Sequence, residues 1–167
     1  MNLEQVKKDI ESWIVNFVEV PHPALGGWPP CPYARRARLN SSYAVQLGTE
    51  LTADLNRVVA NGLEGKEVLV LVYDRTQYTH QEFAHTLDQA NQHLLLSHDL
   101  LALEDHPDDA EIVNGVCMNQ GTYALALIQS LSDLNNKAGA MAAKGFYDTW
   151  PEDYLQMLFS NRQDPRQ

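Results

Sequence analysis

Hydrophobic positions along the chain alternate between helical spacing and short unbroken apolar runs, which predicts helices and strands in turn. Helical spacing of apolar residues near the N-terminus predicts a helix over 2–19. Its apolar face is formed by Leu3, Val6, Ile10, Trp13, Ile14 and Phe17. A short helix is expected over 32–37. The clearest strand is 68–73, Val-Leu-Val-Leu-Val-Tyr, because an apolar run without alternation indicates burial on both faces.

The remaining pattern adds further strands and helices in alternation. Strands are expected over 39–47 and 98–104, with a weaker strand or a loop over 112–118; helices are expected over 50–61, 79–96, 119–136 and 152–159. The helix over 119–136 depends on Leu125, Ile128, Leu131 and Leu134, which recur at steps of three. Strand–helix–strand units favour parallel neighbours. We therefore expect a single domain, residues 1–167, of the α/β or α+β class. It would have a small, mostly parallel sheet of three to four strands, with extra helices at both ends.

Composition narrows the possible partners and the compartment. The chain is 44% hydrophobic and 20% charged, as in ordinary globular proteins, but its formal net charge is −10. An excess of carboxylates argues against nucleic acid or an anionic membrane surface as the main partner. No apolar run is long enough to span a bilayer, and the N-terminus lacks the apolar core of a signal peptide. With only two cysteines, a cytoplasmic location is expected.

Residues 22–38 form the most unusual stretch, because three prolines surround one of the two cysteines: Pro29, Pro30 and Pro32 enclose Cys31. Each proline fixes its own φ and keeps the preceding residue out of the helical region. The Cys31 thiol is then expected at the start of the 32–37 helix, where backbone N–H groups and the nearby Arg35 would lower its pKa. The alternative is an inert, buried cysteine that packs as a small hydrophobe.

Chemistry is expected at the carboxyl ends of the strands, where ligands bind in sheets of this kind. Cys31 is predicted to meet four polar residues there, Asp74, Arg75, Asp105 and His106. Cysteine with histidine suits thiol chemistry: Cys31 would be a nucleophile or redox thiol and His106 a base or acid. Asp105 or Asp74 would orient the imidazole. The alternatives are a solvated loop for His106 and a surface ion pair for Asp74 with its neighbour Arg75.

A small cluster of arginines stands out in this acidic chain. Arg35 and Arg38 are expected to bind an anionic group of a substrate, unless they pair with surface carboxylates. The chain has no glycine-rich nucleotide-binding motif and no histidine pair of the HExxH type, and the sequence leaves the cofactor unknown. If a metal were bound, its best ligands would be His106, Asp105, Glu104 and Cys31.

Two blocks of sequence resemble an uncharacterised bacterial family of unknown function. Trp13-Ile14 followed by Pro30-Cys31-Pro32-Tyr33-Ala34 resembles its Trp-Val or Trp-Ile pair and Leu-Cys-Pro-Phe-Ala motif; His106-Pro107-Asp108 and Asn119-Gln120-Gly121-Thr122-Tyr123 resemble its His-Pro-Asp and Asn-x-Ser-Pro-Tyr motifs. The chain departs from the family at Ala124, where the family has proline, and at Asp109, where it has an aromatic residue. The resemblance implies a common fold and adds Asn119 and Tyr123 as polar contacts, but implies no reaction.

Three functions are therefore open. The first is a small cytoplasmic enzyme that uses Cys31 and His106 on a small, anionic metabolite. The second is a non-catalytic domain that binds a small molecule or a protein, with a pocket but no reactive thiol. The third is a metalloprotein that uses histidine and carboxylate ligands. The oligomeric state is not indicated by the sequence.

Overall fold

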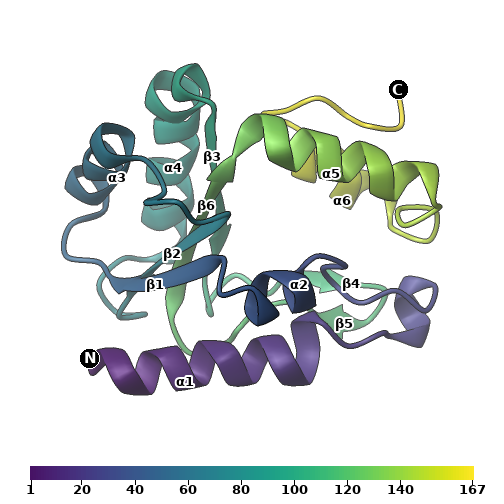
Figure 1. The fold of residues 1–167 in the computed structure, drawn as a ribbon, viewed down its shortest axis with the longest axis horizontal. Coiled ribbons are helices and arrows are strands. Elements are labelled where there is room, and N and C mark those ends of the chain that lie inside the picture. The colour runs from purple at the N-terminus through teal and green to yellow at the C-terminus, as the bar shows by residue number, and fades with distance from the viewer.

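A mixed four-stranded sheet forms the centre of the protein (Figure 1). The computed structural model describes residues 1–167, and the sheet order is β1 (Tyr43–Leu47), β2 (Val68–Tyr73), β6 (Ala124–Ser130) and β3 (Leu100–Asp105). Only β1 and β2 pair in parallel, because β6 lies between β2 and β3 and runs antiparallel to both. The class is α+β with four strands in this sheet, and the expectation of a mostly parallel sheet is wrong.

Six α-helices and a small hairpin complete the fold. The helices are α1 (Leu3–Trp13), α2 (Ala34–Leu39), α3 (Leu51–Asn61), α4 (His80–Ala90), α5 (Leu131–Ala143) and α6 (Glu152–Leu158); the hairpin joins β4 (Ile112–Val113) to β5 (Val116–Cys117). A π-helical turn over Ile14–Val18 extends α1, and another over Asn91–Leu95 extends α4. The predicted terminal helices are therefore confirmed. None of the helices is both long enough and apolar enough to cross a lipid bilayer.

The main error of the sequence prediction concerns residues 119–136. Residues Ala124–Ser130 form the central strand β6, and the helix α5 begins only at Leu131. Ala-Leu-Ala-Leu-Ile has high helix propensity, but both of its faces are buried here. Burial between two neighbouring strands outweighs the intrinsic preference of alanine and leucine for helix.

The two faces of the sheet are covered differently. On one face, alternate residues such as Leu69, Leu71 and Ile128 pack against α3 and α4 in a cluster of 14 buried residues. On the other face, α1 covers Val45, Val70 and neighbouring residues of β1 and β2. Figure 1 shows α3 and α4 on one side of the sheet, with α1 and α5 on the other side. Helices α5 and α6 belong to a third, separate apolar cluster.

A buried carboxylate stabilises the carboxyl end of β1 and β2. Asp54, fully buried at the start of α3, accepts hydrogen bonds from the Thr49 backbone N–H at 2.7 Å and the Tyr73 hydroxyl at 2.9 Å. Gly48 lies directly against the Tyr73 ring, so that a Cβ at this position would overlap the ring atoms. The close approach explains why glycine stands at the end of β1.

Candidate functional site

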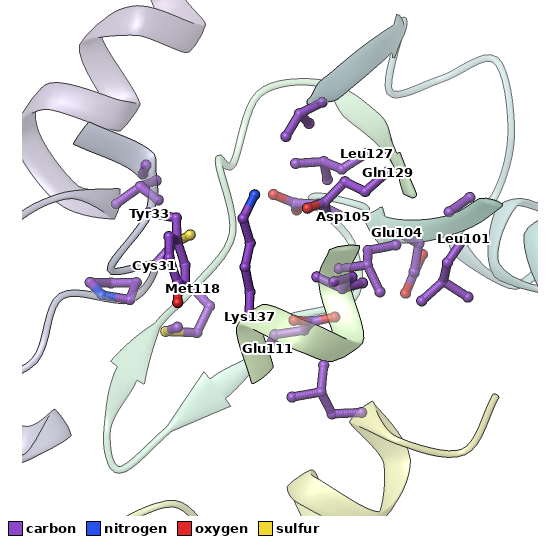
Figure 2. Close-up of a pocket in the computed structure, with 18 of the residues that line it drawn as sticks. Cys31, Tyr33, Leu101, Glu104, Asp105, Glu111, Met118, Leu127, Gln129 and Lys137 are labelled. Carbon is purple, nitrogen blue, oxygen red and sulfur yellow. The ribbon is translucent and has the colours of Figure 1, made fainter. Parts of the chain in front are cut away.

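A cavity of about 520 Å³ lies on the sheet face that α1 leaves partly uncovered. Its walls come from α1 and the following π-helical turn, the proline-rich segment, residues of all four strands, the helices α4 and α5 and the C-terminal region around α6. Of its 39 lining residues 27 are hydrophobic, so the interior is mainly apolar. Figure 2 shows part of this cavity in close-up.

The floor of the cavity follows from the register of β6 and β3. Leu101 pairs with Gln129 and Leu103 pairs with Leu127, and all four residues line the cavity. Because side chains alternate across a strand, these positions share the face of α1. Helix α1 reaches only the β1, β2 and β6 part of this face. The half formed by β3 and the end of β6 therefore meets the cavity rather than a packed helix.

The roof of the cavity is an aromatic cluster in the C-terminal region. Phe146 packs edge-to-face on Tyr147, with ring centroids 4.8 Å apart, and lies 5.3 Å from the ring of Trp150. Tyr154 on α6 continues the cluster, 5.6 Å from Trp150. All four rings line the cavity. Aromatic rings of this kind give a binding site large apolar surfaces with fixed orientation.

Cys31 lines the cavity, as does Tyr33, immediately before α2. Burial raises the pKa of the Cys31 thiol. The backbone N–H groups of Tyr33 and Ala34 and the charge of Lys137 lower it by smaller amounts. The effect of the helix start is therefore present, but the predicted net lowering of the thiol pKa is wrong because desolvation is the larger influence. A reactive role for this thiol stays a prediction.

Lys137 on α5 is the basic residue of the cavity wall, and Figure 2 shows it between Cys31 and Tyr33 on one side and the strand residues on the other. Its Nζ lies 2.7 Å from Asp133 and 3.2 Å from Glu67. The same amine is 5.3 Å from the centre of the Tyr33 ring. The charge of Lys137 is therefore already balanced by carboxylates of the protein.

The opposite part of the cavity is acidic. Three carboxyl residues line it near the end of β3: Glu104, Asp105 and Glu111. Burial and the neighbouring charge of Asp109 raise the pKa of Glu104 to about 8, and burial raises the pKa of Glu111 to about 7. Burial also raises the pKa of Asp105. No salt bridge in the structure involves any of these three side chains.

The structure does not bring His106 into the cavity with Cys31. His106 is fully buried beside Phe83, on the α4 side of the sheet, and is absent from the cavity lining. Its Nε2 donates to the Tyr78 carbonyl at 3.0 Å, and its Nδ1 accepts from the Asp108 backbone N–H at 3.1 Å. Both ring nitrogens are thus occupied by the backbone. Asp105, one residue earlier, points to the other face and does not bond the imidazole.

The other predicted site residues serve the fold or lie outside the cavity. Arg38 makes a bidentate pair with Glu19, at 2.9 and 2.7 Å, while Arg35 is exposed. Asp74 is exposed and accepts hydrogen bonds from Thr76. None of the three predicted residues lines the cavity. The arginine–carboxylate pairing that the sequence left open is therefore the arrangement found for Arg38.

Asn119 and Tyr123, the two residues added by the family resemblance, make polar contacts within the chain. The Tyr123 hydroxyl donates to Asp9 at 2.6 Å and so ties the start of β6 to α1. The Asn119 side chain donates to Asp105 at 2.8 Å and accepts from the Glu111 backbone N–H at 2.7 Å. Asn119 therefore positions two of the acidic residues of the cavity without lining it.

Metal binding receives no geometric support. No group of three or more histidine, cysteine, aspartate or glutamate side chains is arranged to hold a metal ion. The four ligands considered from the sequence are divided, since His106 faces α4 whereas Cys31, Glu104 and Asp105 line the cavity. A tetrahedral or octahedral site needs its ligands to converge on one point.

Lys137 and Glu111 are cavity residues that the sequence reasoning missed. Lys137 stands one residue beyond the helix expected over 119–136, where the pattern of leucines had ended. Glu111 stands in a polar loop before β4, with nothing in its neighbours to indicate burial. Only the aromatic roof of the cavity had a weak signal in the sequence, because three aromatic residues fall within five positions: Phe146, Tyr147 and Trp150.

Comparison with known proteins adds no further constraint. No protein-family model matches the chain, and neither a curated protein nor a solved structure matches it. The resemblance to the uncharacterised bacterial family therefore stays a prediction.

Proposed function

We propose that the protein binds a small, largely apolar molecule in its central cavity. The observation that carries the proposal is the cavity itself, about 520 Å³ in volume and lined mainly by hydrophobic side chains. Sites for small molecules and cofactors typically measure about 300–1,000 Å³ and combine apolar walls with a few polar groups. Protein interiors are otherwise packed as closely as organic crystals. An apolar ligand would give the lining residues the contacts that the chain itself does not supply.

The arrangement of the cores supports a binding role. The sheet packs against α3 and α4 on one face and against α1 on part of the other face. The remaining part faces a cluster that is built separately from α5, α6 and the aromatic residues of the roof. Two cores that face each other across a cavity form a typical site for a ligand between them.

A thiol enzyme is the second candidate, because Cys31 lines the same cavity. Two observations make it the weaker one. The pKa of the thiol is raised, and a thiol is a poorer nucleophile than a thiolate. His106 lies outside the cavity, so no histidine of the lining stands ready as a base. Equal ligand binding by wild type and Cys31→Ser would favour the binding protein.

The test uses decanol as a neutral apolar probe below its solubility limit. Trp13 and Trp150 line the cavity, so binding is expected to change tryptophan fluorescence in a saturable way. The variants Leu127→Trp and Met118→Trp each place a large side chain in the cavity wall, and both are expected to weaken binding about tenfold or more. Two variants are used because either substitution alone can impair folding, which circular dichroism reveals.

The matched control is Leu39→Trp, at an exposed position that does not line the cavity. It adds the same side chain and is expected to retain wild-type affinity, measured by amide chemical-shift changes so that the added tryptophan does not interfere. Absence of saturable binding by the wild type, or unchanged affinity in a folded cavity variant, would overturn the proposal.

A further inference from the structure

Resting on the proposed function, we infer that the bound molecule carries a neutral carbonyl group, as in a ketone or an ester, whose oxygen accepts a hydrogen bond from Trp150 Nε1. The apolar remainder of the molecule extends along the floor formed by β3 and β6, beneath the aromatic roof. The sequence suggested an anionic metabolite instead, bound by Arg35 or Arg38, neither of which lines the cavity.

Trp150 has an unused hydrogen-bond donor in the roof of the cavity. Its side chain lines the cavity, and the residue is only 9% exposed. Its Nε1 is buried and has no hydrogen-bond partner. A buried tryptophan N–H usually has a partner, and leaving one unpaired is costly. Because the indole nitrogen can only donate, the group that it lacks is an acceptor atom.

The rings around Trp150 hold the indole in place without pairing its N–H. Tyr154 lies 5.6 Å from Trp150 between ring centroids, and the Tyr154 hydroxyl donates to Glu111 at 3.1 Å. Phe146 and Tyr147 pack against the indole from the other parts of the roof. The chain therefore provides an acceptor for Tyr154 but none for Trp150. A donor that packing has already oriented loses little entropy when a ligand pairs with it.

Trp13, a second tryptophan of the cavity wall, also has an unpaired donor. It lies at the end of α1 and lines the cavity, and its Nε1 is buried without a hydrogen-bond partner. The third tryptophan, Trp28, does not line the cavity and has no buried, unpaired Nε1. The two unpaired indole donors of the protein therefore both belong to the cavity, which favours a ligand with acceptor atoms. We assign the main contact to Trp150 because Trp13 is less deeply buried.

The charges of the lining favour a neutral acceptor over a carboxylate. Lys137 is the one basic residue that lines the cavity, and its amine is paired with Asp133 at 2.7 Å and with Glu67 at 3.2 Å. A carboxylate group of a ligand would therefore find no free cation in the lining. Burying an unpaired charge costs far more than burying a neutral polar group, and one indole N–H cannot offset that cost.

A carbonyl group suits this donor better than a hydroxyl group. A carbonyl oxygen only accepts, whereas a hydroxyl group also brings a hydrogen that needs an acceptor of its own. The ring nearest to that of Trp150 belongs to Phe146, with centroids 5.3 Å apart, and it offers no acceptor. A ketone or ester therefore supplies the missing acceptor and adds no unpaired donor.

The experiment compares 2-octanone with 2-methyl-1-octene, in which a CH₂ group replaces the carbonyl oxygen and the shape is almost unchanged. Each probe is kept below its solubility limit, and amide and indole chemical shifts report binding. Both probes should bind the wild type saturably, because they share the apolar contacts. Only 2-octanone should move the Trp150 indole N–H proton downfield, since only its oxygen can accept the hydrogen bond. The Trp28 indole signal should change little with either probe.

Trp150→Phe removes the donor and keeps an aromatic ring. It should reduce the affinity for 2-octanone about three- to tenfold more than the affinity for 2-methyl-1-octene, as expected for one neutral hydrogen bond. The matched control is Trp28→Phe, which makes the same change in a ring that contacts Phe146 but does not line the cavity. It should leave the ratio of the two affinities unchanged. Octanoate at pH 8 should bind at least about tenfold more weakly than 2-octanone.

The outcomes distinguish the two proposals. If Trp150→Phe weakens both probes by the same factor, or the wild-type Trp150 signal does not move downfield with 2-octanone, the carbonyl contact fails while the binding function stands. If the Trp13 signal moves downfield in place of the Trp150 signal, the assignment to Trp150 fails. If octanoate binds as tightly as 2-octanone, the neutral class of ligand fails. If neither 2-octanone nor 2-methyl-1-octene binds saturably, the proposed function itself fails. The indole signals of the wild type decide the first point even if Trp150→Phe does not fold.

Discussion

The side-chain amide of Asn119 donates a hydrogen bond to the carboxylate of Asp105 at 2.8 Å. The same amide donates to the carbonyls of His106 and Asp109, both at 3.1 Å. Its oxygen accepts from the Glu111 backbone N–H. One residue between β5 and β6 thus holds the whole acidic loop that follows β3. We expect the shape of the acidic end of the cavity to depend on this residue more than on any residue within the loop.

Replacing Asn119 tests this dependence. Asn119→Ala leaves the Asp105 carboxylate with one hydrogen bond fewer and should lower the free energy of unfolding by about 1–3 kcal/mol, measured by urea denaturation. Asn119→Asp places a second negative charge beside Asp105 and should be more destabilising above pH 6. Asn136→Ala, at an exposed position on α5, serves as the control and should change stability by less than about 0.5 kcal/mol. Equal effects at the two positions would contradict the role given to Asn119.

The raised carboxyl pKa values predict how stability changes with pH. Glu104 and Glu111 bind protons more tightly in the folded state than in the unfolded chain, so their contribution to stability is complete at low pH and is lost as the pH rises through about 7 to 8. The Tm should therefore fall between pH 6 and 9, by about 4–8 °C if the pair contributes roughly 2 kcal/mol.

A double variant, Glu104→Gln with Glu111→Gln, should flatten this profile and raise the Tm at pH 9 above that of the wild type. Glu11→Gln should leave the profile unchanged. Calorimetric scans at intervals of one pH unit make the measurement. A wild-type Tm that rises between pH 6 and 9 would mean that these carboxyls ionise freely in the folded protein.

The contact between Gly48 and Tyr73 predicts a severe effect from one methyl group. In Gly48→Ala the new Cβ overlaps the Tyr73 ring, whose hydroxyl is bonded to the buried Asp54, so the ring cannot move without breaking that bond. Overpacking of this kind should cost about 1–3 kcal/mol. Gly139→Ala makes the same change within α5, where a Cβ meets nothing within 4 Å, and should stabilise the protein by about 0.5–1 kcal/mol. Chemical denaturation of both variants would show whether the two changes differ in sign.

The two cysteines provide an internal comparison of thiol reactivity. Cys117 is exposed, whereas Cys31 lies in the cavity wall and its pKa is raised by burial. At pH 7 iodoacetamide should modify Cys117 at least about tenfold faster than Cys31, because only the thiolate reacts. Saturating decanol should slow Cys31 further and leave Cys117 unaffected, as mass spectrometry of the two peptides would show. Faster modification of Cys31 would restore the reactive-thiol hypothesis.

Local patterns predicted most of the elements correctly. The unbroken apolar run at Val68–Tyr73 is a buried strand, and the helix expected over 79–96 begins in the structure with a capping box formed by Thr79 and Glu82. Both features depend on neighbours within a few residues. The placement of β6 depends instead on which strands lie beside it, and residues far along the chain decide that. Periodicity alone cannot distinguish such a buried strand from a helix.

The candidate site was predicted in part. Cys31 and Asp105 do line one cavity. The cavity lies on a face of the sheet, however, and not at the carboxyl ends of β1 and β2, since its lining includes Val68 at the start of β2 and leaves out Asp74. The prediction for His106 depended on its position at the carboxyl end of the expected third strand, where Asp105 also stands, yet adjacent residues at the end of a strand point to opposite faces. The charged groups Lys137 and Glu111 come from segments with no distinctive pattern, and only the packing of α5 and α6 brings them to the cavity.

The position of β6 also affects how the chain can fold while it is being synthesised. Its neighbours β2 and β3 leave the ribosome first. The edge of each strand that will pair with β6 stays without a partner until the chain has been extended to about residue 130. The last large strand to be made is then inserted into the middle of the sheet. Exposed strand edges invite association with other chains. Nascent forms of this protein should therefore depend on protection by chaperones until the final quarter of the polypeptide emerges.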